Sequence, residues 1–269
     1  MKDLPAPGHI HTGTIGSGAR DVLAVHCTLA HSGAWKGLAA ALPDTTFHVF
    51  DMPSHGRSAD WDEGLGDYQD QGTEAALGLL TRPMDVIGHS FGATIALRLA
   101  VEHPDRVRSL TLIEPVFFAV AAQDAPDILA DHDARSVPFF DALTQGETEE
   151  AARRFNRLWS DGPSWVDMPA GLRAAMIRAI PVVPACRAAI YDDRAGLLAP
   201  GQLDRVTMPA QLLRGAATDT LIAPVNEGLA ARLPDARSVV VPGAGHMLPI
   251  THPIETAALV RDLFARAPV

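Results

Sequence analysis

The chain has 269 residues, of which 47% are hydrophobic and 20% are charged, which suits one large domain with an insertion and argues against disorder. The net charge is −10 and the 22 Lys and Arg residues are scattered, so no basic stripe indicates a nucleic-acid partner. Neither a signal peptide nor a membrane-spanning stretch is visible, so we expect a cytoplasmic protein without a membrane partner. Cys27 and Cys186 show neither metal spacing nor a disulfide framework, and we predict no metal and no cofactor.

Short apolar segments alternate with helical patterns along most of the chain. Because most of the apolar segments are hydrophobic nearly throughout, they are typical of strands covered on both faces of a parallel sheet. The alternation predicts an α/β fold with right-handed crossovers. The expected strands are 9–15, 22–27, 47–52, 84–89, 107–114, 210–215 and 237–243, and the expected helices are 33–42, 71–81, 91–103, 224–233 and 253–266.

The stretch 115–205 interrupts this alternation, since it lacks strand patterns and reads as several helices broken by prolines. We therefore expect a core domain formed by 1–114 and 206–269, with 115–205 as a helical cap or lid. Four aromatic residues of this stretch are candidates for lining a substrate pocket: Phe117, Phe139, Trp159 and Trp165.

The segment MDVIGHSFGATIALRLA, residues 84–100, contains the pattern Gly-x-Ser-x-Gly between a predicted strand and a predicted helix. In this context the pattern is typical of a nucleophile elbow, a sharp turn that presents a serine above the sheet. The flanking positions must lack side chains, which explains Gly88 and Gly92. We predict Ser90 as the nucleophile.

A serine nucleophile needs a base and a group that orients the base. His246 lies in a Gly/Pro loop after the last expected strand and is our candidate base. His252 is nearby but directly precedes Pro253 at a helix start, so we read it as a turn residue. For the acid, Asp219 and Glu114 both follow expected strands. Spacing and order favour Asp219, with Glu114 as the alternative.

The order of Ser90, Asp219 and His246 resembles the α/β-hydrolase superfamily, as do the motifs GHSFG, DMPSHGRS, GAATDTLIAP and GAGHMLPITHP. The resemblance runs from about residue 20 to the end, apart from the insertion. It implies an α/β-hydrolase fold, with a mostly parallel eight-stranded sheet flanked by helices, a helical cap and a Ser–His–acid triad. In this family the aspartate after the strand is the usual acid, and the position of Glu114 is a known alternative.

The family also needs two backbone N–H donors for the oxyanion. Phe91, directly after the nucleophile, is one. The stretch VHCTLAHSGAW, residues 25–35, aligns with the second donor loop and places Thr28 at the donor position. Cys27 stands where the family usually has glycine. We expect a small, half-buried cysteine at the pocket rather than a thiol nucleophile, because neighbouring strand residues point to opposite faces.

Three histidines near this loop need a role. We expect His26 to brace the loop by hydrogen bonds, and His31 to face either the pocket or solvent. His55 and Arg57 lie in DMPSHGRS, which we interpret as a tight structural loop in which Ser54 replaces a usual glycine.

These features predict a serine hydrolase that cleaves a small-to-medium carboxylic ester, thioester or lactone through an acyl-enzyme on Ser90. A carbon–carbon bond hydrolase or a cofactor-free peroxidase would use the same triad. A non-catalytic receptor on the same fold is a further alternative. The sequence leaves open whether the protein is a monomer or a homodimer.

Overall fold

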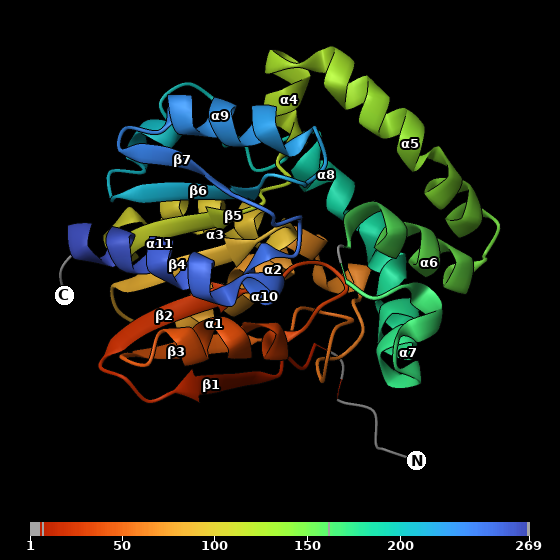
Figure 1. Ribbon diagram of the computed structural model, residues 1–269, viewed down its shortest axis with the longest axis horizontal. Helices are drawn as coiled ribbons and strands as arrows, with labels where there is room; N and C mark the ends of the chain where they lie inside the picture. The colour runs from red at the N-terminus through yellow and green to blue at the C-terminus, as the bar shows by residue number, and fades with distance from the viewer. Residues whose placement is uncertain (1–5, 7, 161, 268–269) are drawn as a thin grey trace.

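The computed structural model describes residues 6, 8–160 and 162–267 and has a twisted central sheet with helices on both faces (Figure 1). The described part of the chain forms seven strands in the order β1-β3-β2-β4-β5-β6-β7. The resemblance implied eight strands, and the structure corrects this number to seven. The strands are β1 (Thr12–Gly16), β2 (Arg20–Val25), β3 (Thr45–Phe50), β4 (Met84–His89), β5 (Val107–Ile113), β6 (Ala210–Gly215) and β7 (Ala236–Val241).

All neighbouring strands are parallel except β1, which runs antiparallel to β3 at one edge of the sheet. The register brings Gly88 of β4 beside Val25 of β2 on one side and beside Leu112 of β5 on the other. The carboxyl ends of these three central strands therefore meet at one edge, where α/β sheets gather their functional residues.

Helices cover both faces of the sheet, as the alternating pattern predicts. One face packs against α1, α10 and α11, and the other packs against α2, α3 and α9 (Figure 1). These two layers bury the apolar side chains of the strands between them, which supplies most of the hydrophobic stabilisation. The six helices are α1 (Lys36–Ala41), α2 (Tyr68–Leu79), α3 (Phe91–Glu102), α9 (Ile222–Arg232), α10 (Leu248–Thr251) and α11 (Pro253–Arg266).

The stretch between β5 and β6 lies beyond the carboxyl ends of the strands and is helical (Figure 1). Part of it packs into the same apolar cluster as the sheet, while α5, α6 and α7 share a second cluster around Phe139 and Met176, together with Leu29 of the loop after β2. The helices are α4 (Phe118–Asp124), α5 (Pro126–Thr144), α6 (Thr148–Trp159), α7 (Ala170–Ala179) and α8 (Arg187–Ile190).

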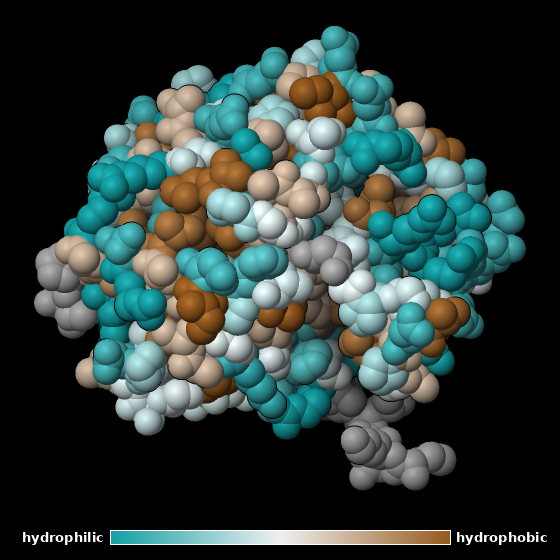
Figure 2. Space-filling view, in the orientation of Figure 1, coloured by the Kyte–Doolittle hydropathy of each residue, from teal (hydrophilic) through white to brown (hydrophobic). Residues whose placement is uncertain are grey.

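The surface is mostly hydrophilic on the face that Figure 2 shows, with a hydrophobic area over the region of β7, α10 and α11. Exposed large apolar residues of these elements include Val240, Ile250 and Ile254. Within the described residues, no helix is both long and apolar enough to cross a membrane.

Candidate active site

Ser90 sits at the turn between β4 and α3 in a backbone conformation that side-chain-bearing residues rarely adopt. Its φ is 56° and its ψ is −118°, so the surrounding structure must hold it there. The two glycines of the motif, Gly88 and Gly92, allow the close packing that holds the Ser90 backbone in this conformation. A Cβ on Gly88 would lie 2.3 Å from the Gly92 carbonyl oxygen, and one on Gly92 would lie 2.3 Å from the Val25 carbonyl oxygen. The strand, the turn and the helix therefore pack too closely for any side chain at these positions.

His246 follows β7 and is paired with a carboxylate inside the protein. Its Nδ1 lies 2.9 Å from Oε2 of Glu114, which directly follows β5 and is fully buried. The same carboxylate accepts hydrogen bonds from the Gly215 N–H at 2.6 Å and the Thr218 hydroxyl at 2.5 Å. Because a carboxylate only accepts hydrogen bonds, Nδ1 of His246 carries the proton, which leaves Nε2 free to act as a base.

The expectation that Asp219 orients His246 is not met. Its carboxylate instead faces the helices above the sheet, where it binds Arg135 of α5 at 2.7 Å and 3.2 Å and lies 3.4 Å from Nδ1 of His132. Burial opposes ionisation of Asp219, but the hydrogen bonds from His132 and Arg135 outweigh it and lower the pKa of this carboxyl. The physical reason for the correction is that Asp219 has other partners, and the alternative, Glu114, occupies the position beside His246.

His89, the second residue of the elbow motif, connects the serine turn to the histidine loop. Its Nε2 donates to the backbone carbonyl of His246 at 2.8 Å, and the two rings are 5.3 Å apart. Burial lowers the pKa of His89 to about 3, so this ring is neutral and serves as a fixed donor. It places the His246 loop next to the residue that precedes Ser90. Sequence reasoning assigned no role to His89.

Two backbone N–H groups beside Ser90 lack an acceptor among the described residues: those of Thr28 and Phe91. Phe91 is the first residue of α3, and an N–H at this position has no partner within its own helix. Thr28 lines the same hollow as Ser90, and the close approach of Gly92 to Val25 brings the start of α3 against the end of β2. These are the two donors that the sequence predicted for an oxyanion.

The loop that carries Thr28 is held by DMPSHGRS, through three hydrogen bonds. His26 Nε2 accepts from the Met52 N–H at 2.9 Å, His55 Nε2 accepts from the Leu29 N–H at 2.9 Å, and Asp51 accepts from the Ser32 N–H at 2.7 Å. Burial lowers the pKa of His26 to about 4 and that of His55 to about 3. Both rings are therefore neutral braces at neutral pH, in keeping with the structural roles inferred from the sequence.

The backbone conformation of Ser54 explains why the family usually has glycine at this position. Its φ is 66°, a left-handed conformation that glycine adopts without strain. The Ser54 hydroxyl accepts a hydrogen bond from the Trp61 N–H at 2.9 Å. This local contact supports the serine in a conformation that would otherwise favour glycine.

Cys27 is buried more deeply than expected. It is 3% exposed, and burial raises the pKa of its thiol to about 12. A thiol in this state is not a nucleophile at neutral pH. His26, its neighbour, donates from Nδ1 to the Cys27 backbone carbonyl at 2.8 Å and accepts at Nε2 from the Met52 N–H, so its ring nitrogens are engaged with the backbone rather than with the thiol. No group of three or more His, Cys, Asp or Glu side chains in the described part of the chain is arranged to hold a metal.

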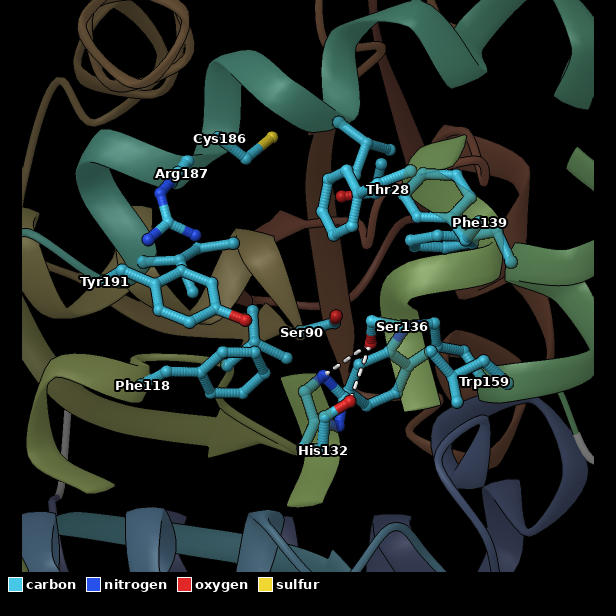
Figure 3. A pocket seen from close by; sticks show the side chains of 16 residues that line it. Thr28, Ser90, Phe118, His132, Ser136, Phe139, Trp159, Cys186, Arg187 and Tyr191 are labelled. Atoms are coloured by element: carbon cyan, nitrogen blue, oxygen red, sulfur yellow. Dashed lines mark hydrogen bonds between the residues drawn. The ribbon is translucent and has the colours of Figure 1, made fainter. Parts of the chain in front are cut away.

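Ser90 opens into a hollow of about 630 Å³, including the open space at its mouth, between the sheet and the helices above it (Figure 3). Its wall is mainly apolar and aromatic, which is typical of small-molecule sites. Of the predicted pocket residues, Phe139 and Trp159 line it. The Trp159 ring lies 4.7 Å from the His246 ring. Further lining residues include Thr28, Phe118, His132, Ser136, Phe155, Cys186, Arg187 and Tyr191.

Four predicted pocket residues lie elsewhere. Cys27 and Phe117 are buried in the protein interior, because each follows a central strand closely and packs against the core. His31 is exposed and its Nδ1 accepts from the Gly33 N–H at 3.0 Å, which caps a short helix. Trp165 packs against the cluster around α5, α6 and α7, outside the hollow.

Sequence reasoning missed the polar part of the wall, His132 and Ser136 of α5. The available signal was their spacing: residues four apart in a helix share a face, and Phe139 continues the same face. The reading of 115–205 as several helices broken by prolines did not use this spacing.

Comparisons with known proteins identify the family to which this fold belongs. Residues 22–259 match the model of the alpha/beta hydrolase family. A pimeloyl-(acyl-carrier protein) methyl ester esterase of Nitrosomonas europaea is 29% identical over 88% of this chain and 92% of its own. The lipase LipV of Mycobacterium tuberculosis is 27% identical over 91% and 94%.

A solved structure of a hydrolase from Pseudomonas aeruginosa covers 95% of this chain and 94% of its own, with a TM-score of 0.71 and 22% identity. At this identity the likeness shows the fold. The esterase and lipase relatives confirm the expected enzyme class, a carboxylic ester hydrolase. With a family model that spans most of the sequence, this chain belongs to the alpha/beta hydrolase family.

Proposed function

We propose that this enzyme cleaves a small-to-medium carboxylic ester through an acyl-enzyme on Ser90, with His246 as the base and Glu114 as the acid. The observation that carries the proposal is the contact of 2.9 Å between His246 Nδ1 and the buried Glu114 carboxylate, next to a strained serine turn. The esterase relatives support an ester as the bond that is broken.

The reaction follows from these positions. Ser90 Oγ attacks the ester carbonyl carbon while His246 Nε2 takes the hydroxyl proton. The N–H groups of Thr28 and Phe91 hold the oxyanion of the tetrahedral intermediate. His246 then gives its proton to the leaving alcohol, and the acyl-enzyme remains. Water, deprotonated by His246, releases the acid and restores Ser90. Glu114 stabilises the imidazolium in both halves.

The helices of 115–205 form the upper wall of the hollow, and we propose that they act as a cap that selects the substrate. Phe118, Phe139 and Trp159 provide an apolar surface for a hydrocarbon chain. Burial of such a chain contributes about 0.8 kcal/mol for each methylene group. We therefore expect kcat/KM to rise with chain length until the hollow is filled.

The test is a panel of p-nitrophenyl esters, alkyl esters, thioesters and lactones, with Ser90→Ala as the control. We expect the wild type to hydrolyse esters and to react with a fluorophosphonate probe, and Ser90→Ala to do neither. Labelling that persists in Ser90→Ala would contradict the assignment of the nucleophile. Turnover of no ester in the panel would contradict the proposed substrate class.

Location in the cytoplasm and a choice between monomer and homodimer stay predictions. Cys27 and Cys186 are both free and buried, which is compatible with a reducing compartment. Light scattering on the purified protein decides the oligomeric state, and fractionation of the native cells decides the location.

A further inference from the structure

The upper wall of the hollow contains a buried polar pair that the reaction at Ser90 does not use. His132 and Ser136 are one turn apart on α5, are 2% and 4% exposed, and face the hollow (Figure 3). Ser136 Oγ lies 3.4 Å from Nε2 of His132 and donates to the backbone carbonyl of His132 at 3.0 Å. A buried polar pair in a substrate pocket needs a reason, because polar groups are costly to bury without partners.

Asp219 fixes which nitrogen of His132 carries the proton. Its Oδ2 lies 3.4 Å from Nδ1 of His132, and the pairing with Arg135 keeps the carboxylate ionised. Since an ionised carboxylate only accepts hydrogen bonds, Nδ1 is protonated and Nε2 presents a lone pair. Ser136 Oγ has a single proton, which it directs to the backbone carbonyl of His132 at 3.0 Å or to Nε2 of His132 at 3.4 Å. In either case the pair has more acceptor positions than donors, so a ligand that supplies a donor fits it.

The surroundings of the pair make it selective. The rings of Phe118 and Trp159 each lie 5.2 Å from the His132 ring, so the acceptors stand in an apolar wall. A plain hydrocarbon chain in this position would displace water and supply no donor to these acceptors, whereas a chain with a hydroxyl group would supply one. Sites built in this way discriminate against the analogue that lacks the polar group.

We propose that His132 and Ser136 form a hydroxyl-binding subsite, which selects esters whose chain carries a hydroxyl group at a distance from the ester bond. The substrate hydroxyl donates to Nε2 of His132 and contacts Ser136 Oγ. Asp219 acts as a positioning residue for His132. This inference rests on the proposed ester hydrolysis and specifies the substrate class of the same site.

The kinetic test uses two matched series: p-nitrophenyl esters with a hydroxyl moved along the acyl chain one carbon at a time, and monoesters of straight-chain diols. Each is compared with the unsubstituted ester of equal length. We expect one position in one series to raise kcat/KM about threefold to tenfold in the wild type, and the series that responds shows whether the acyl or the alcohol part carries the hydroxyl.

The variants Ser136→Ala and His132→Phe should bring the ratio of kcat/KM for the hydroxylated ester to kcat/KM for the unsubstituted ester down to one. The matched control is Thr144→Val, because Thr144 also lies on α5 and also donates to the carbonyl four residues before it, at 2.9 Å, but is exposed. It should keep the ratio. A purely structural role of the pair would instead lower the melting temperature and leave the ratio unchanged, which would overturn the proposal.

A binding experiment separates this inference from the proposed function. Calorimetry on Ser90→Ala measures the affinity for a hydroxy acid and for the plain acid of the same length, with and without Ser136→Ala. Tighter binding of the hydroxy acid that depends on Ser136 supports the subsite even if no ester is turned over. Equal affinities, or hydrolysis of plain esters with no preferred hydroxyl position, overturn the subsite while ester hydrolysis stands.

Discussion

Replacing Glu114 by glutamine tests which carboxylate serves His246. Glutamine keeps the shape of the buried side chain and its bond from the Gly215 N–H. Its NH₂ group then faces Nδ1 of His246 in place of Oε2 and can only donate. This favours the tautomer with the proton on Nε2, which cannot accept the proton of Ser90. Loss of the correct tautomer costs a triad enzyme about 10⁴ in kcat, or about 5.4 kcal/mol.

Asp219→Asn should behave differently. It leaves the contact between His246 and Glu114 in place and changes only the contacts of Asp219 with Arg135, His132 and the Leu221 N–H. We expect kcat on a short plain p-nitrophenyl ester to fall by less than about tenfold. Glu227→Gln, which changes an exposed carboxylate, is the control for the substitution itself. A larger loss in Asp219→Asn than in Glu114→Gln would refute the assignment.

Three further predictions follow from the same geometry. Cys27→Ala should retain fluorophosphonate labelling, because burial raises the pKa of this thiol to about 12; loss of labelling in a folded protein would restore the thiol as nucleophile. Gly92→Ala should unfold the protein or lower its melting temperature strongly, since the new Cβ would meet the Val25 carbonyl oxygen at 2.3 Å. Gly78→Ala in α2, which meets nothing within 4 Å, should instead stabilise it by about 0.5–1 kcal/mol. Stability should fall as pH drops from about 6.5 to 4, because His26, His55 and His89 have lowered folded-state pKa values of about 4, 3 and 3. The unfolded chain binds these protons first, at a cost of about 2 kcal/mol per histidine at pH 5, which urea titrations across this range measure.

The elements that position the nucleophile could be predicted from the sequence because they depend on local patterns. The run MDVIGH is apolar enough to be a central strand. The glycines at 88 and 92 indicate close packing, although the sequence does not identify the neighbouring atoms. The seven apolar segments all became strands. The eighth strand came only from the family resemblance, and no apolar segment of the chain corresponded to it.

The choice between Glu114 and Asp219 could not be made in this way. Each follows a strand, and the difference lies in contacts between distant parts of the chain. Glu114 reaches His246, 132 residues later, while Asp219 binds Arg135, 84 residues earlier. Nothing in the local sequence around either carboxylate encodes these partners. The same limit applies to His132, whose place in the hollow depends on how α5 lies over the sheet.

The packing of 115–205 shows how the wall above Ser90 is attached to the body of the enzyme. Val182 and Ala189 belong to the same apolar cluster as the sheet, so the last part of this stretch is fixed to the body of the enzyme. The helices α5, α6 and α7 share a second cluster that also includes Leu29 of the loop after β2, while Leu129 of α5 and Trp159 of α6 pack against the first cluster. Arg135 binds this unit to Asp219, and Arg178 of α7 binds it to Asp60 at 2.7 Å. The wall formed by α5, α6 and α7 is therefore joined to the body by ion pairs and by the apolar contacts of Leu29, Leu129 and Trp159. In this arrangement, Asp219 connects the wall formed by α5, α6 and α7 to the body through Arg135, and Glu114 takes the place beside His246.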